Sequence, residues 1–97
     1  MKIYKDSALS IEIELLDLGI VQAGDSKEYE FYIYNETVAE LVDLSFSIDS
    51  KEVEILSYPK TLKSKEKSEL KLKYSPSINL KQGLKAILKF KGAEVYS

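Results

Sequence analysis

Apolar and polar residues alternate along most of this chain, and this two-residue period limits the fold more than any other feature of the sequence. In the run EYEFYIY at residues 28–34, Tyr29, Phe31 and Ile33 fall on one face of an extended strand. No segment carries a sustained apolar stripe at the helical period of about 3.6 residues. The alternation therefore predicts an all-β fold made of several short strands.

The same alternation predicts the core. Residues on the inner faces of the strands are expected to pack between two sheets, where burial of each large side chain contributes roughly 1.5–3 kcal/mol. Asn35 is expected to end its strand, because its side chain can bond to local backbone. The predicted core residues are Tyr29, Phe31, Ile33, Val42, Leu44, Phe46, Ile48, Leu70, Leu72, Tyr74, Leu84, Ala86, Leu88 and Phe90, with Leu62 as the anchor of a connection.

Two further features concern how strands end. The apolar phase shifts between Ile13 and Leu16, which predicts a bulge or a change of sheet near residues 15–17. Gly92 predicts a tight turn into a short last strand at residues 93–97. A short last strand leaves backbone groups of its neighbour open, so we expect a protein partner, a second copy or a next domain to add a strand there.

The chain has 97 residues, enough for one domain, residues 1–97, with a single core and no deep internal pocket. We expect residues 1–8 to form a flexible arm. No apolar run approaches the roughly 20 residues that span a bilayer, and the N-terminus lacks the apolar centre of a signal peptide. Membrane insertion is not expected, and a native start at Met1 would place the protein in the cytoplasm or in a virion.

The absence of several residue types excludes classes of chemistry. The chain has no cysteine and no histidine, which removes thiolate chemistry, the commonest metal ligand and the usual acid–base side chain near neutral pH. Carboxylate pairs such as Glu12 and Glu14 lie on an open face, without the burial that acid–base catalysis requires. Every basic residue is lysine, and without arginine we expect no sequence-specific nucleic-acid binding. We therefore expect no enzyme, no catalytic residue, no cofactor and no metal.

Short motifs occur in a recognisable order along residues 16–90. They are Leu16, Leu18, Gly19 and Val21, then Gly24 and Ser26, then Phe31, Ile33 and Asn35, and later Pro59, Leu62, Tyr74, Pro76, Gly83 and Ile87. In this order they resemble the abnormal-spindle/hydin-type immunoglobulin-like domains, relatives of the major sperm protein fold. The resemblance implies an immunoglobulin-like β-sandwich of about seven antiparallel strands in two sheets. It also implies a binding or spacer module without catalysis.

Two tyrosines are candidates for partner binding on the outer face of the strand at residues 28–34. Tyr32 and Tyr34 lie one pleat apart on that face. They form either an aromatic contact patch, since tyrosine is enriched at interface hot spots, or ordinary packing against the stems of Lys71 and Lys73.

Charge is divided unevenly along the chain. Residues 1–58 hold four lysines and thirteen acids, a net charge of −9, whereas residues 59–97 hold ten lysines and three acids, a net charge of +7. The strands around residues 11–15, 28–34 and 68–74 are expected to share one sheet, where acids should face lysines. The pairs expected there are Glu28 and Glu30 with Lys71 and Lys73.

A row of lysines marks the last long strand. Lys85, Lys89 and Lys91 are expected to point outward from the other sheet, where few acids lie nearby. The row is either a solvated strand face that resists edge pairing, or a face for an anionic partner.

These features favour a non-catalytic structural or interaction module. We expect a phage-virion or cell-surface accessory protein that binds a protein partner or lattice through an edge strand or through Tyr32 and Tyr34. The alternative is a binding module for cell-surface carbohydrate or another anionic polymer, which would use Lys85, Lys89 and Lys91 with exposed tyrosine.

Overall fold

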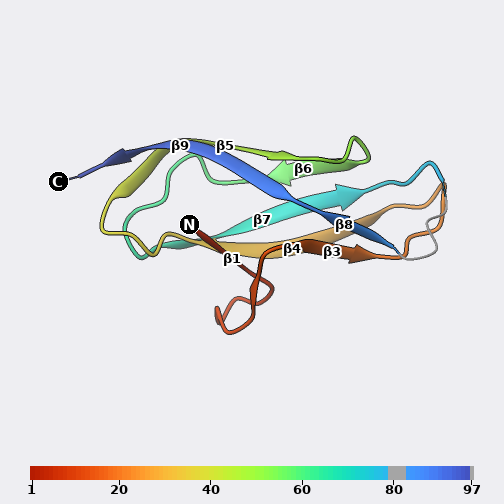
Figure 1. The fold of residues 1–97 in the computed structure, drawn as a ribbon, viewed down its shortest axis with the longest axis horizontal. Helices are drawn as coiled ribbons and strands as arrows, with labels where there is room; N and C mark the ends of the chain where they lie inside the picture. The colour runs from red at the N-terminus through yellow and green to blue at the C-terminus, as the bar shows by residue number, and fades with distance from the viewer. Residues whose placement is uncertain (79–82, 97) are drawn as a thin grey trace.

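The computed structural model of the chain describes residues 1–78 and 83–96 (Figure 1). These residues form nine strands and no helix. The prediction of an all-β chain is confirmed for these two stretches. The strands are β1 (Lys2–Tyr4), β2 (Glu12–Ile13), β3 (Leu16–Gly19), β4 (Lys27–Tyr34), β5 (Glu40–Ile48), β6 (Val53–Ser57), β7 (Lys67–Tyr74), β8 (Leu84–Ala86) and β9 (Leu88–Val95).

Antiparallel pairing arranges the strands as one sheet of five and two sheets of two. The five-stranded sheet has the order β2-β1-β4-β7-β6, and the two-stranded sheets are β3–β8 and β5–β9. The expected grouping of residues 11–15, 28–34 and 68–74 is confirmed in outline, since β2, β4 and β7 belong to the five-stranded sheet. Strand β1, which the sequence pattern did not predict, lies between β2 and β4.

The apolar faces of the three sheets meet in one core. Ile33, Leu70 and Leu72 of the five-stranded sheet are fully buried, and they belong to the same cluster as buried side chains of β3, β5, β8 and β9. Leu62 is also buried, and it exchanges two backbone hydrogen bonds of 2.8 Å with Leu41. The predicted anchor is therefore confirmed. The other predicted core residues that are buried are Phe31, Leu44, Tyr74, Ala86 and Leu88, and those that are half-buried are Tyr29, Val42, Phe46, Ile48 and Leu84.

The chain changes sheets between β2 and β3, as the shift in apolar phase predicted. Ile13 of β2 pairs with β1 in the five-stranded sheet, whereas Leu16 of β3 pairs with β8. The change of phase buries Leu16 and leaves Ile11 and Leu15 exposed. The segment before β3 therefore keeps apolar side chains that its own fold does not cover.

A bulge in β5 changes which of its residues face the core. Asp43 has a φ of 53°, and together with Leu44 it stands opposite the single residue Gly92 of β9. Aspartate enters this left-handed conformation more readily than most residues. Leu41 and Leu44 are both buried as a result, and Val42 between them is only half-buried. The expected strict alternation of β5 is thus wrong across the bulge.

Gly92 lies within β9, and the expected turn at this position is wrong. The strand continues through Gly92 to Val95, still paired with β5. A Cβ at Gly92 would stand 2.7 Å from Leu44 Cδ2 and 3.1 Å from the carbonyl oxygen of Val42. The bulged strand thus approaches β9 too closely for a side chain, and this contact rather than a turn explains the glycine.

The molecule is elongated, with extents of 48 × 25 × 16 Å and a radius of gyration of 14.3 Å. A compact domain of this length has a radius of gyration of about 12.5 Å. In Figure 1, β8 starts beside β3 at the lower right, and β9 runs from there to β5 along the upper edge. An elongated shape leaves much of β9 at the surface.

The N-terminal arm includes β1, which pairs with β4 and β2. A loop at residues 5–11 joins β1 to β2, and the amide of Lys5 donates to the carbonyl of Ile11 across its base, at 2.9 Å. The Asp6 carboxylate accepts hydrogen bonds from the Ser10 hydroxyl and from the amides of Ser10 and Ile11. These bonds, the one from the Ser10 hydroxyl above all, lower the pKa of Asp6.

Candidate functional site

Strand β9 is exposed over nearly its whole length. Residues 89–95 are all exposed, and only Leu88 at the start of the strand is buried. Within the described residues, β9 has one paired neighbour, β5. The second edge of β9 is open because β3 reaches only as far as β8, and the segment before β3 has joined the five-stranded sheet as β2.

The backbone of β9 presents hydrogen-bonding groups at this open edge. The amide of Ile87 donates to Asp49 Oδ1, 2.9 Å away, on the side of β5. Successive amides of an extended strand point to opposite edges, so those of Leu88 and Phe90 point away from β5. A strand that docks along β9 could pair with them directly.

A shallow hollow of about 540 Å³ lies against β5 and β9, lined by residues 45–47 and 88–91. Phe90 is 44% exposed at this hollow, and its ring centre lies 6.4 Å from that of Phe46. Tyr58 packs edge-on against Phe46, with ring centres 5.5 Å apart. The prediction that Phe90 is a core residue is wrong, because β9 lies at the margin of its sheet and no described strand covers it there.

The lysine row lies on β8 and β9, beside the open edge. Lys85, Lys89 and Lys91 are all exposed. None of the four ion pairs found in residues 1–78 and 83–96 involves these lysines. Their positive charges are therefore not held in ion pairs within the described part of the chain. The residues directly opposite on the neighbouring strands are Asp17, Ser47 and Ser45.

The two candidate tyrosines lie on the outer face of the five-stranded sheet. Both Tyr32 and Tyr34 are half-buried, because β1 lies beside them. Tyr4 of β1 stands opposite Tyr32, and its ring packs edge-on against Tyr34 with ring centres 6.5 Å apart. The third member of this cluster, Tyr4, was missed because a strand of three residues is too short to show an alternating pattern.

The lysines expected to pack against the tyrosines have other partners. Strand β4 pairs with β7 so that Glu28 stands opposite Lys73 and Glu30 opposite Lys71. This register confirms that the two acids stand beside the two lysines. Lys71 Nζ lies 3.8 Å from Glu30 Oε1, as an exposed ion pair. The residues of β7 opposite Tyr32 and Tyr34 are Glu69 and Lys67.

The candidate residues thus form two separate surfaces. Tyr32 and Tyr34 belong to the five-stranded sheet, whereas Lys89 and Lys91 belong to the β5–β9 sheet and Lys85 to the β3–β8 sheet. A single ligand-binding site that combines all five residues is not formed by this arrangement.

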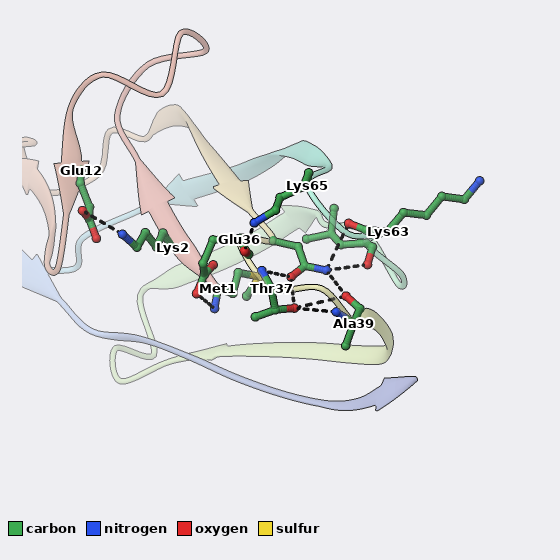
Figure 2. A network of polar contacts seen from close by, with 10 residues as sticks. Met1, Lys2, Glu12, Glu36, Thr37, Ala39, Lys63 and Lys65 are labelled. Carbon is green, nitrogen blue, oxygen red and sulfur yellow. Dashed lines mark hydrogen bonds and ion pairs between the residues drawn. The ribbon is translucent and has the colours of Figure 1, made fainter. Parts of the chain in front are cut away.

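Asn35 organises a buried polar network at the end of β4, and its partners Thr37, Ala39 and Lys63 are labelled in Figure 2. Its Nδ2 donates to the carbonyl oxygens of Ala39 at 2.8 Å and of Leu62 and Lys63, both at 3.1 Å. Its Oδ1 accepts from the amide and the hydroxyl of Thr37, at 3.0 and 2.6 Å. Asn35 therefore bonds to local backbone as expected, and it also joins two connections that are distant in sequence. Such full satisfaction is typical of a structural residue.

Glu36 lies beside this network (Figure 2). Its Oε1 accepts a hydrogen bond of 3.0 Å from the amino group of Met1, whereas Oε2 is buried without a partner in the described residues. Burial alone would raise the pKa of the Glu36 carboxyl. The hydrogen bonds from its own amide and from the amino group of Met1, together with the charges of that amino group and of Lys2, outweigh burial, so the pKa is lowered.

In the described stretches, no three acidic side chains gather as a metal ion would need, and no helix is present that could cross a membrane. Tyr29 is among the residues of β3 and β4 that line a second hollow of about 470 Å³, and its phenol donates a hydrogen bond to the carbonyl of Leu18. Burial raises the pKa of Tyr29. A phenol committed to a backbone carbonyl in this way has a structural role.

Comparison with protein families, with curated proteins and with solved structures finds no match to this chain.

Proposed function

We propose that this chain is a non-catalytic interaction module, which binds a protein partner by accepting an extended strand along the open edge of β9. The observation that carries the proposal is the open edge itself. Residues 89–95 are exposed there, and the hollow beside Phe90 and Phe46 lies next to them. Main-chain pairing would supply affinity, and the hollow would receive an apolar side chain of the partner.

We infer that the fold is an immunoglobulin-like sandwich. One layer would contain β4, β6 and β7, and the other would contain β3, β5 and the nearly continuous β8 and β9. The single core cluster, with members from both layers, supports this arrangement. On this interpretation the second layer lacks a strand beside β9, and the strand of the partner would complete it.

A regular protein lattice is the setting that we propose for the partner. The surface of a phage virion or of a cell would present the same extended segment many times. The tyrosine cluster, Tyr4, Tyr32 and Tyr34, would then serve as a second contact on the opposite sheet, since half-buried tyrosines offer rigid contact area.

The lysine row favours a second candidate function, the binding of an anionic polymer such as a cell-surface carbohydrate. Lys85, Lys89 and Lys91 are exposed and without ion pairs in the described residues. Binding of this kind would fall steeply with salt, because exposed charges are screened at distances beyond about 8–10 Å at physiological ionic strength.

The strand-docking proposal is tested with a displayed library of random extended peptides, selected for binding to the whole chain. Amide chemical-shift mapping then locates each selected peptide. We expect shifts at residues 88–95, peptides that alternate apolar with polar residues, and loss of binding in Phe90→Lys. Shifts confined to Tyr32 and Tyr34, or equal binding by Phe90→Lys, would overturn the proposal.

The polymer candidate is separated by a titration with a sulfated polysaccharide at several salt concentrations. Binding that weakens with salt and is lost in Lys85→Glu/Lys89→Glu/Lys91→Glu, while peptide selection finds nothing at β9, would favour the polymer over the protein partner.

A further inference from the structure

We propose that the strand added to β9 comes from a second copy of this chain, whose residues 11–15 dock parallel to β9 along the open edge. This inference rests on the interaction function proposed above and names its partner.

The segment at residues 11–15 is poorly covered in its own fold. Its sequence, IEIEL, alternates apolar and acidic residues. Ile11 is 52% exposed and Leu15 46% exposed, although such side chains are usually buried. Only two of its residues form a strand, β2, and within the described residues β2 pairs on one side alone, with β1. The segment therefore offers an unpaired edge and apolar side chains together.

This segment and β9 are complementary in a parallel register. With Ile13 opposite Phe90, Glu12 stands opposite Lys89 and Glu14 opposite Lys91, so the apolar side chains share one face and the carboxylates lie beside the lysines.

The amide of Lys5 donates to the carbonyl of Ile11, so the backbone groups of Ile11 and Ile13 point to β1 and those of Glu12 and Glu14 point to the free edge of β2. Because the backbone groups of Leu88 and Phe90 point to the open edge of β9, matching faces can form ladder hydrogen bonds only when the two strands run parallel.

A slip of one residue destroys this match. It would place a glutamate opposite Phe90 and an isoleucine opposite a lysine, because neighbouring side chains of a strand point to opposite faces. Complementarity in only one phase is what specific strand pairing requires.

Charge favours this segment over pairing of β9 with β9. Two β9 strands side by side would bring the rows of Lys89 and Lys91 together, and like charges that face each other across strands are destabilising. The acidic segment instead neutralises the row. Within one chain, β1 holds β2 in the five-stranded sheet, away from β9. A contact between two different edges of two copies is heterologous, so each copy keeps one edge for the next copy.

The proposal is tested by charge exchange, with molecular mass measured by sedimentation velocity over a range of concentrations. We expect the mass of the unaltered chain to rise with concentration. Lys89→Glu/Lys91→Glu and Glu12→Lys/Glu14→Lys should each weaken association at least about tenfold. An equimolar mixture of the two variants should associate again, since each lysine pair then meets a glutamate pair.

The register is tested with engineered cysteines, because the chain has none of its own. A mixture of Glu12→Cys with Lys89→Cys should form the mixed disulfide on oxidation. A mixture of Glu12→Cys with Lys85→Cys should form at most about a tenth as much. The matched charge control is Lys51→Glu/Lys60→Glu, whose lysines are exposed and lie outside β9. This variant should associate like the unaltered chain.

A chain that stays monomeric at millimolar concentration, or a mixture that fails to recover association, overturns the proposal. If selected peptides still map to residues 88–95 in that case, the edge belongs to a different protein or to another segment, and the proposed function survives. If no peptide binds there either, both proposals fail.

Discussion

The phenol of Tyr29 donates a hydrogen bond to the backbone carbonyl of Leu18, and this bond joins β4 of the five-stranded sheet to β3 of the neighbouring sheet. Leu18 is buried and Tyr29 is half-buried. The amine of Lys27 lies over the ring, 5.3 Å from its centre. The bond therefore fixes β3, the strand that follows the change of sheets.

Removal of this hydroxyl should destabilise the fold. In Tyr29→Phe, the carbonyl of Leu18 loses its donor, so we expect the free energy of unfolding to fall by about 0.5–1.5 kcal/mol. Urea denaturation measures the change. Tyr58→Phe is the matched control, since Tyr58 is exposed and should change by less than about 0.5 kcal/mol. Equal stability of Tyr29→Phe and the unaltered chain would contradict this account of the bond.

Stability should depend on alkaline pH through Tyr29 and Tyr74. Burial raises the pKa of both phenols above the usual 10.0, and the charge of Glu52 adds to the effect at Tyr74. The unfolded chain then loses these protons at lower pH than the folded chain. Stability from this source is therefore full below about pH 10 and is lost as the pH rises through the folded-state values.

Unfolding free energies measured between about pH 9 and 11.5 check this dependence. We expect a smaller decline with pH in Tyr29→Phe/Tyr74→Phe than in the unaltered chain. The lysines titrate in both proteins, so the difference between the two curves isolates the phenols. Parallel curves would show that the two phenols do not contribute.

Asn35 should be among the most sensitive positions of the chain. Asn35→Ala removes one of the two hydrogen bonds that each of three carbonyl oxygens accepts, and it also removes the acceptor of the Thr37 amide and hydroxyl. We expect a loss of about 2–3 kcal/mol, since several net hydrogen-bond contributions of about 0.5–1.5 kcal/mol are lost together. Asn35→Asp has nearly the same shape but directs a carboxylate at those oxygens. It should lose more stability at pH 7 and recover part of it in acid. Thermal unfolding at two pH values measures both effects, and a pH-independent Asn35→Asp would contradict the arrangement.

Gly92→Ala should be destabilising by about 1–3 kcal/mol, because the added Cβ collides with the side chain of Leu44 and approaches the carbonyl of Val42. A double-mutant cycle with Leu44→Ala tests the cause. In the Leu44→Ala background the same glycine substitution should cost less, since the nearest atom is gone. Additive effects of the two substitutions would exclude this contact as the reason.

The ion pair between Lys71 and Glu30 should contribute little. Both side chains are about half exposed, at 46% and 55%, and pairs of this kind contribute about 0–1 kcal/mol. We expect Glu30→Gln to lower the unfolding free energy by less than about 1 kcal/mol at low salt, and by still less in 1 M salt. A large effect that survives salt would point to a role beyond this ion pair.

The two-residue period predicted the parts of the fold where one face of a strand is buried. Ile33, Leu70 and Leu72 are fully buried where the alternation placed them. The same pattern, combined with the distribution of charge, predicted that Glu28 and Glu30 face lysines of β7. These features depend on local residue order, which is what a sequence displays directly.

The features that the pattern missed depend on contacts between distant strands. The bulge at Asp43 shifts the phase of β5, and Gly92 looks like a turn residue until the bulged strand is seen beside it. Phe90 follows the alternation but is exposed, because a side chain on the inner face of an edge strand is buried only where a further strand covers it, and no described strand lies on the other side of β9.

The extra residue in β5 also affects how the gene can change. Deletion of Asp43 would remove the bulge and leave Leu41 and Leu44 on the same face, because the remaining residues of β5 would then alternate without interruption against β9. Deletion of Ser47 would instead turn Leu44 and Phe46 away from the core if both ends of the strand keep their partners. A codon lost at Asp43 should therefore harm the protein less than a codon lost at Ser47, although both residues are exposed.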